Sequence, residues 1–205
     1  PILVSSEFSK TMTARYVLFS LPFYVVGAGS IFLTTRKLIY RFGILLFAIF
    51  IFQSVIFDYL LLVDPKLANL PRSERSGYLE EWTAGQGIRE IADYLNKLPA
   101  DKNVVVGTEG YFGTLPDGLQ IYFDKNKSIK IIGIGLELDK IPLQLVKAKE
   151  AGNLVYFIAN NERMNTDYKT LNLKLIAQYP KALRPNGTNQ SLLFFEVTNE
   201  TISKF

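Results

Sequence analysis

Residues 15–64 read RYVLFSLPFYVVGAGSIFLTTRKLIYRFGILLFAIFIFQSVIFDYLLLVD and decide the architecture of this chain. They contain two long apolar runs, 16–35 and 42–57, and neither run has a charged side chain. A helix needs about twenty mostly apolar residues to cross a bilayer, and the second run reaches this length when Asp58 lies at the interface and 59–63 extend it. Neither run has the polar face of an amphipathic soluble helix. The stretch therefore predicts a transmembrane helical hairpin.

The loop between the two runs is basic, because it contains Arg36, Lys37 and Arg41. Short loops that are rich in Lys and Arg stay in the cytoplasm. Residues 1–14 and everything after Asp64 are then expected on the extracytoplasmic side. The chain has no Met at position 1, and we expect it to be a fragment whose N-terminal part is missing.

The composition excludes several classes of site. The 205 residues include no cysteine and no histidine, which excludes disulfides, Ser-His-Asp triads and nearly every zinc site. Carboxylates, Lys, Arg, Tyr and hydroxyl groups remain as the available polar chemistry. The net charge is only +4, and no basic cluster with interleaved aromatic residues is present, so no nucleic-acid partner is expected.

Strand and helix patterns alternate in the second half of the chain. Helices are expected at 87–98, 115–123 and 142–150, and strands at 104–106, 129–134, 154–159, 173–179 and 191–197. The last two strands flank the turn signal Pro185-Asn186-Gly187, which indicates an antiparallel pair. The pattern predicts an α/β domain whose sheet is mostly parallel with an antiparallel edge pair.

The chain is therefore expected to have four parts. An extracytoplasmic segment, 1–14, precedes two transmembrane helices with a cytoplasmic basic loop, 15–64. A juxtamembrane connector, 65–81, leads to an extracytoplasmic α/β domain, 82–205.

Polar side chains follow two of the expected strands, and they form the first candidate binding site. Thr108 and Glu109 come at the end of one strand, and Asn160 and Arg163 follow another. Ligands of open α/β sheets usually bind beyond the carboxyl ends of the strands. These four residues are the candidates for contact with a substrate in the α/β domain.

Three glycines, Gly107, Gly110 and Gly113, lie between the same strand and the next helix. Such a turn can bind a phosphate through backbone N–H groups and a helix N-terminus. The spacing is not that of a dinucleotide fingerprint, and the lysine of a P-loop is missing. Ordinary tight turns are the alternative interpretation.

A second candidate group lies near the expected outer headgroup layer. It consists of Arg15, Tyr16, Arg72 and Arg75. A guanidinium group can bind a lipid phosphate through two hydrogen bonds. The alternative is that these residues only anchor the helices at the interface, and Trp82 fits the same aromatic belt.

Two stretches resemble a known family. Residues 13–19, TARYVLF, are followed by Leu21-Pro22-Phe23, and residues 77–87 read GYLEEWTAGQG. Together with the basic hairpin, they resemble the C-terminal part of bacterial membrane glycosyltransferases of family 39. This group is similar to the dolichyl-phosphate-mannose-protein mannosyltransferases and includes relatives of the aminoarabinose transferase of lipid A.

The resemblance implies a multi-pass GT-C enzyme of the bacterial cytoplasmic (inner) membrane that acts on the cell envelope. Such an enzyme takes a sugar from a lipid-linked donor, a polyprenyl phosphate, and transfers it to an acceptor glycan, lipid or protein at the extracytoplasmic face. The catalytic carboxylate of the family lies in the first extracytoplasmic loop, which this chain does not contain. No catalytic residue is therefore assigned here, and no cofactor other than the lipid-linked donor is expected.

Three hypotheses follow. The first is the C-terminal part of such a glycosyltransferase. The second is a membrane-tethered α/β binding module for a glycan or a protein partner. The third is an autonomous enzyme that uses Glu109 and Asp117 as a carboxylate pair, although Asp117 also fits a helix capping box with Thr114.

Overall fold

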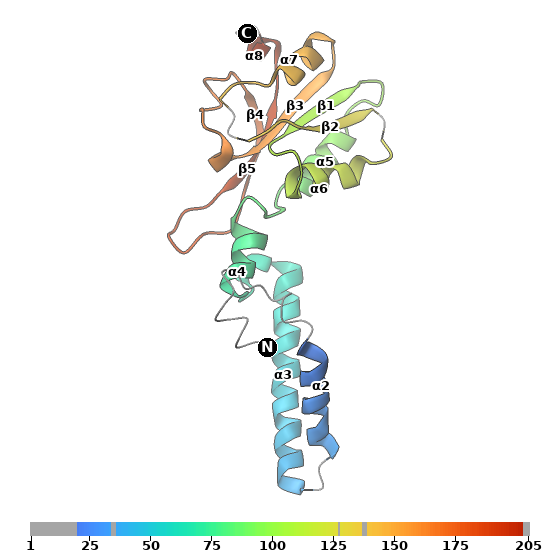
Figure 1. The fold of residues 1–205 in the computed structure, drawn as a ribbon, viewed down its shortest axis with the longest axis vertical. Helices are drawn as coiled ribbons and strands as arrows, with labels where there is room; N and C mark the ends of the chain where they lie inside the picture. The colour runs from blue at the N-terminus through green and yellow to red at the C-terminus, as the bar shows by residue number, and fades with distance from the viewer. Residues whose placement is uncertain (1–19, 34–35, 127, 137–138, 203–205) are drawn as a thin grey trace. The chain divides into compact units, whose positions relative to one another are not determined.

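The computed structural model describes residues 20–33, 36–126, 128–136 and 139–202. The chain divides into two compact units, Pro1–Arg75 and Ser76–Phe205 (Figure 1). Six residues of the expected connector, 76–81, belong to the second unit, because Leu79 and Glu80 are buried there. Arg15 and Tyr16 lie outside the described residues.

The first unit is helical. Its elements are α2 (Leu21–Ser30), η3 (Ile31–Leu33), α3 (Lys37–Val63), η4 (Pro65–Leu67) and α4 (Arg72–Arg75). In the part of the chain that the structure describes, α3 is the one helix long and apolar enough to cross a membrane. Gly43 is the buried residue of this helix, and most of the large apolar side chains of α3 are exposed. The expected first span is described only in part, because it begins at residue 16.

The short helix η3, which follows α2, contacts α3 through apolar side chains. The rings of Phe32 and Phe47 lie edge to face, with centroids 5.5 Å apart. An apolar groove of about 580 Å³ lies between α2 and α3, and the small residues Ala28, Gly29 and Gly43 line part of it. Small residues let helix backbones approach closely in a bilayer.

The second unit is an α/β domain, which confirms the predicted fold class of this part. It contains η5 (Ser76–Glu80), α5 (Ile88–Asn96), β1 (Val104–Thr108), α6 (Thr114–Phe123), β2 (Ile129–Gly133), α7 (Leu143–Glu150), β3 (Leu154–Asn160), η6 (Asn161–Arg163), β4 (Lys174–Pro180), β5 (Ser191–Glu196) and α8 (Asn199–Ile202). The strand order is β2-β1-β3-β5-β4. Every expected strand and helix of the domain is present, with ends that shift by a residue or two.

The sheet is mixed rather than mostly parallel. Strand β1 pairs in parallel with β2 and β3, and β5 pairs antiparallel with both β3 and β4. The expected antiparallel pair is therefore β4 and β5, with β4 at the edge. Strand β4 runs in the same direction as β1 and β3, because β5 reverses the direction once on each side. The carboxyl ends of β1, β3 and β4 consequently share one edge of the sheet.

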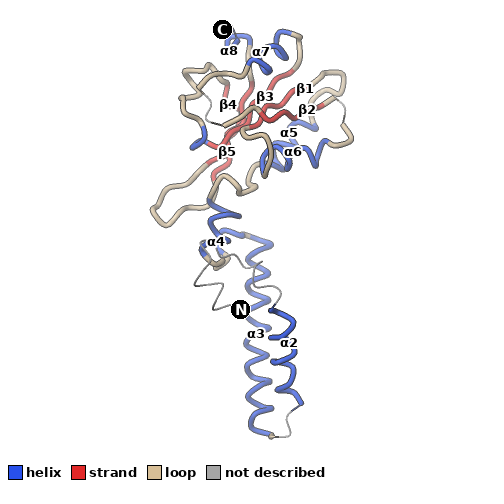
Figure 2. Tube along the Cα trace, in the orientation of Figure 1, coloured by secondary structure: helices blue, strands red, loops and turns tan. Residues whose placement is uncertain are grey.

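Helices cover both faces of the sheet (Figure 2). Side chains alternate along a strand, so Ile158 faces α5 and α6 while Phe157 faces the opposite side. The first core contains Leu95 of α5 and Leu119 of α6, and the second contains Leu145 of α7. Burying both faces requires nearly continuous apolar strands, and β3 and β5 are indeed buried along most of their length.

Candidate functional site

Three of the four predicted strand-end residues meet at the carboxyl ends of β1 and β3. Glu109 follows β1, and its Oε2 accepts a hydrogen bond of 2.9 Å from the backbone N–H of Asn160. Its Oε1 accepts one of 2.5 Å from Nδ2 of the same asparagine. Nε of Arg163 lies 3.8 Å from Oε1 of Glu109. These residues come together because parallel neighbouring strands end at the same edge of a sheet.

Thr108 is buried next to Glu109 but points elsewhere. Its hydroxyl donates a hydrogen bond of 3.4 Å to the carbonyl oxygen of Ile132 on β2. The side chain thus connects two strands of the sheet. Among the described contacts, none joins the Thr108 hydroxyl to the carboxylate of Glu109.

Lys181 completes the group and was not predicted. It follows β4, and its buried ammonium group donates hydrogen bonds to Oδ1 of Asn160 and, over 2.9 Å, to the carbonyl oxygen of Glu81. A polar side chain at the end of a strand is the same signal that identified Asn160. The signal was missed because the direction of β4 depends on β5 lying between it and β3.

An outer ring of polar side chains surrounds this centre. Nη2 of Arg184 donates to Glu81 over 2.7 Å, and Nη1 donates to Glu162 over 2.5 Å. Gln190 donates to Glu162 and, over 3.3 Å, to Glu81. We call the whole set the strand-end cluster, which consists of Glu81, Glu109, Asn160, Glu162, Arg163, Lys181, Arg184 and Gln190. It connects the chain just before α5 with the loop between β4 and β5.

The charges of the strand-end cluster balance, because three carboxylates face three cations. Burial raises the pKa of Glu109 even though Asn160, Arg163 and Lys181 favour its charged form. Burial lowers the pKa of Lys181 to about 8, against the attraction of Glu109 and Glu81. Hydrogen bonds from Arg184 lower the pKa of Glu162. Since protein donors occupy the carboxylates, the cluster suits positioning of the loops better than proton transfer.

Trp82 is a partly exposed side chain that contacts the strand-end cluster through Arg163. The guanidinium carbon of Arg163 lies 4.0 Å from the centroid of the Trp82 ring, in cation–π geometry. The tryptophan side chain is 41% exposed, whereas Glu109 beneath the arginine is almost fully buried. Arg163 therefore connects a buried carboxylate with an exposed aromatic ring.

The three glycines after β1 have structural explanations. A Cβ on Gly107 would lie 2.8 Å from the side chain of Leu145, and Gly110 and Gly113 have φ values of +74° and +101°. Oδ2 of Asp117 accepts a hydrogen bond of 3.0 Å from the N–H of Gly113. A carboxylate thus occupies the helix N-terminus where the phosphate-binding interpretation places an anion.

The predicted capping box of Thr114 and Asp117 is not formed, because Gly113 is the N-cap residue of α6. Asp117 still accepts a hydrogen bond at this helix N-terminus, from the N–H of Gly113. The described contacts do not join it to Glu109 as a carboxylate pair. No group of three or more acidic residues that could hold a metal ion occurs among the residues that the structure describes.

Arg72 and Arg75 belong to the second candidate group, which was expected near the outer headgroup layer. Both lie on α4 in the first unit. Nη1 of Arg75 donates a hydrogen bond of 2.9 Å to the carbonyl oxygen of Lys66, so it holds the turn after α3. Arg72 is exposed.

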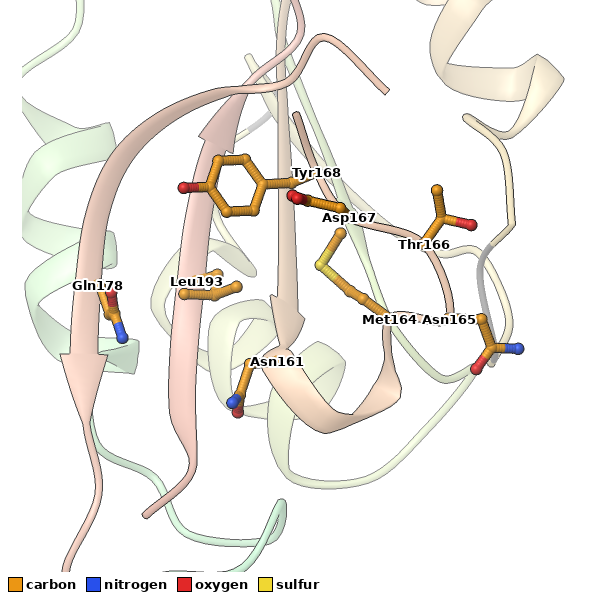
Figure 3. Close-up of a pocket in the computed structure, with 8 residues that line it drawn as sticks. All are labelled: Asn161, Met164, Asn165, Thr166, Asp167, Tyr168, Gln178 and Leu193. Carbon is orange, nitrogen blue, oxygen red and sulfur yellow. The ribbon is translucent and has the colours of Figure 1, made fainter. Parts of the chain in front are cut away.

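A separate pocket, which was not predicted from the sequence, lies beside β4 and β5. Its volume is about 310 Å³. Figure 3 shows the ring of Tyr168 pointing toward these strands, with the Asp167 carboxylate beside it. The pocket is lined by Asn161, Met164, Asn165, Thr166, Asp167, Tyr168, Gln178 and Leu193. Oδ1 of Asn161 accepts from the N–H of Ser191, which fixes this amide at the floor.

Comparison of the chain with protein-family models, curated proteins and solved structures finds no match.

Proposed function

We propose that the chain is the C-terminal part of an integral-membrane glycosyltransferase. The enzyme moves a sugar from a polyprenyl-phosphate donor to an acceptor at the extracytoplasmic face of the bacterial inner membrane. The observation that supports this most is α3, a 27-residue helix with exposed apolar side chains, followed in the same chain by an α/β domain. An apolar surface of this length is unfavourable in water and favourable in a bilayer.

The proposal includes the membrane hairpin and its orientation. The two apolar runs span the bilayer, and Arg36, Lys37 and Arg41 stay on the cytoplasmic side. The α/β domain is then extracytoplasmic, where the reaction with a lipid-linked donor takes place. The lipid carrier confines the donor to the membrane surface, so a domain tethered there can cap the active site or select the acceptor.

The donor phosphate is assigned to the arginines near the outer headgroup layer. Arg15, with Tyr16 beside it, is the first candidate, and Arg72 is the second. Guanidinium groups suit this role because they bind phosphate through paired hydrogen bonds. The catalytic carboxylate is expected in a part of the enzyme that precedes Pro1.

Sequencing of the gene upstream of the Pro1 codon tests the proposal. Further apolar spans and an acidic extracytoplasmic loop near the start are expected. A start codon within a few residues of Pro1 would rule out the glycosyltransferase. In the complete enzyme, Arg15→Ala should raise the donor KM or lower kcat by tenfold or more, equivalent to about 1.4 kcal/mol, and activity within about twofold would contradict the phosphate contact.

The pocket beside β4 and β5 favours a second candidate function, a membrane-tethered module that binds a glycan. Its volume lies at the lower end of the range for small-ligand sites. Three side-chain amides, a carboxylate and a phenol line it, and such groups exchange paired hydrogen bonds with sugar hydroxyls. The ring of Tyr168 adds an apolar surface for the C–H face of a sugar.

Binding of the full chain, in detergent, to a panel of immobilised neutral oligosaccharides separates the two candidate surfaces. Loss of binding in Asp167→Ala, with Arg163→Ala unaffected, would place the glycan in the pocket. Loss in Arg163→Ala alone would place it at the strand-end cluster. No binding to any oligosaccharide of the panel would remove this second function.

A further inference from the structure

The loop after β1 presents two aromatic side chains to solvent. Tyr111 is 74% exposed and Phe112 is 83% exposed. Each carries a large aromatic ring, and the transfer of such apolar surface out of water is favourable. Adjacent exposed aromatic residues of this kind are characteristic of a surface that something covers.

Backbone contacts at both ends of the loop fix the conformation that exposes these rings. The N–H of Gly110 donates a hydrogen bond of 2.7 Å to the carbonyl oxygen of Gly135 at one end of the loop. At the other end, the N–H of Gly113 is held by Asp117 over 3.0 Å. A Cβ on Gly133 would lie only 2.5 Å from the carbonyl oxygen of Gly110, so the loop base packs tightly on β2. The loop is therefore held in a shape that points Tyr111 and Phe112 outward.

Trp82 lies beside this loop. A Cβ built on Gly113 would be 4.0 Å from Cζ3 of Trp82. The tryptophan is itself 41% exposed and carries the guanidinium of Arg163 over its ring. Trp82 and Arg163 therefore lie next to the loop that carries Tyr111 and Phe112, and we call these four residues the aromatic face.

We propose that the aromatic face rests in the headgroup region of the bilayer. Tryptophan and tyrosine favour this region, because their rings are apolar while the N–H and O–H groups need polar partners. Phe112 contributes an apolar ring at the most exposed point, and Arg163 supplies a cation for lipid phosphates.

The connectivity of the chain favours a lipid surface as the partner. Trp82 and the rest of segment 76–84 begin the second unit, and only residues 64–75 separate this unit from the end of α3. The segment that enters the domain is fixed to the edge with the aromatic face, since Lys181 donates to the carbonyl oxygen of Glu81. The inference rests on the proposed membrane location and is independent of glycosyl transfer.

Trp82 is the sole tryptophan of the sequence, so it reports on this face without any added label. The full chain is incorporated into nanodiscs of phosphatidylcholine and phosphatidylglycerol, either with brominated acyl chains or without bromine. We expect a loss of Trp82 fluorescence in the brominated discs. The double variant Tyr111→Ser/Phe112→Ser should weaken this quenching.

The matched control is Ile121→Ser/Tyr122→Ser, which removes two exposed apolar side chains of α6 that lie away from the aromatic face. Its quenching should equal that of the unmodified chain. If the chain enters nanodiscs and Trp82 keeps its full fluorescence, the inference is wrong while the membrane location stands. If acrylamide in the water also fails to reach this unquenched Trp82, a protein surface covers the face instead of lipid.

A chain that does not enter nanodiscs at all would overturn the membrane location and, with it, the inference. This result is distinct from failure of glycosyl transfer, which is measured on the complete enzyme.

Discussion

The guanidinium of Arg163 is stacked 4.0 Å from the ring centroid of Trp82. On its other side, Nε of the same arginine lies 3.8 Å from Oε1 of the buried Glu109. One side chain therefore joins the exposed aromatic face to the interior of the strand-end cluster. Arg163 follows β3 and Trp82 precedes α5, so the contact also joins two segments that are far apart in the sequence.

Replacing Arg163 by alanine should destabilise the α/β domain. The substitution removes the cation–π contact and leaves Glu109 with one cation fewer, and we expect a loss of about 1–3 kcal/mol in the free energy of unfolding. Arg163→Lys keeps the charge but not the planar stacking, and should lie in between. Urea unfolding of the full chain in detergent, followed by Trp82 fluorescence, measures both.

Arg89 offers the control for this series, because it is exposed on α5. Arg89→Ala should change the free energy of unfolding by no more than about 0.5 kcal/mol. Equal unfolding midpoints for Arg163→Ala and Arg89→Ala would show that the stacked arginine contributes nothing to stability.

Lys181 should make the stability of the domain depend on pH in alkaline solution. Burial lowers its pKa in the folded state from 10.5 to about 8. Between these values the unfolded chain binds more protons, so the free energy of unfolding rises with pH. Thermal unfolding by circular dichroism should show this rise between pH 8 and 10, and Lys181→Met should lack it. Parallel curves for the two proteins would contradict the lowered pKa.

Glu109 should make the stability of the domain fall as the pH rises in acidic solution, the opposite of the effect of Lys181. Its pKa is raised above 4.5 in the folded state, mainly by burial. The folded chain then binds more protons just above pH 4.5, and stability falls as the pH rises through the raised pKa. Glu109→Gln removes this group from the titration. Subtracting the variant's melting temperature from that of the unmodified chain at each pH should reveal the fall, and a constant difference would refute it.

Some parts of the strand-end cluster were predictable from the sequence and others were not, for physical reasons. The location of Glu109, Asn160 and Arg163 at one edge was predictable, because they lie at the ends of strands that were predicted to run in parallel, and the structure adds that these strands are neighbours. The position of Lys181 was not predictable. The carboxyl end of β4 lies at this edge only because β5 is inserted between β3 and β4 and is antiparallel to both. The pocket around Tyr168 was also missed, because the loop between η6 and β4 has no periodicity that would place its side chains.

The start of α5 supplies a test of packing. Gly87 is the N-cap residue of this helix, with φ +90°, and a Cβ there would lie 2.6 Å from the ring of Tyr179. Alanine would have to adopt a left-handed conformation, which costs about 1–2 kcal/mol, and would also displace the ring, which costs about 1–3 kcal/mol. Gly87→Ala should therefore lower the free energy of unfolding by the sum of both.

Gly152 separates the two costs, because its φ is +84° and nothing lies within 4 Å of a Cβ built on it. Gly152→Ala should show the conformational cost alone, about 1–2 kcal/mol. Urea unfolding of the two variants side by side gives the difference, which belongs to the contact with Tyr179. If Gly87→Ala is no less stable than Gly152→Ala, α5 does not pack against β4 through this glycine. Gly87→Ala should cost less in the background of Tyr179→Ala than in the unmodified chain, since the smaller side chain leaves room for the new methyl group.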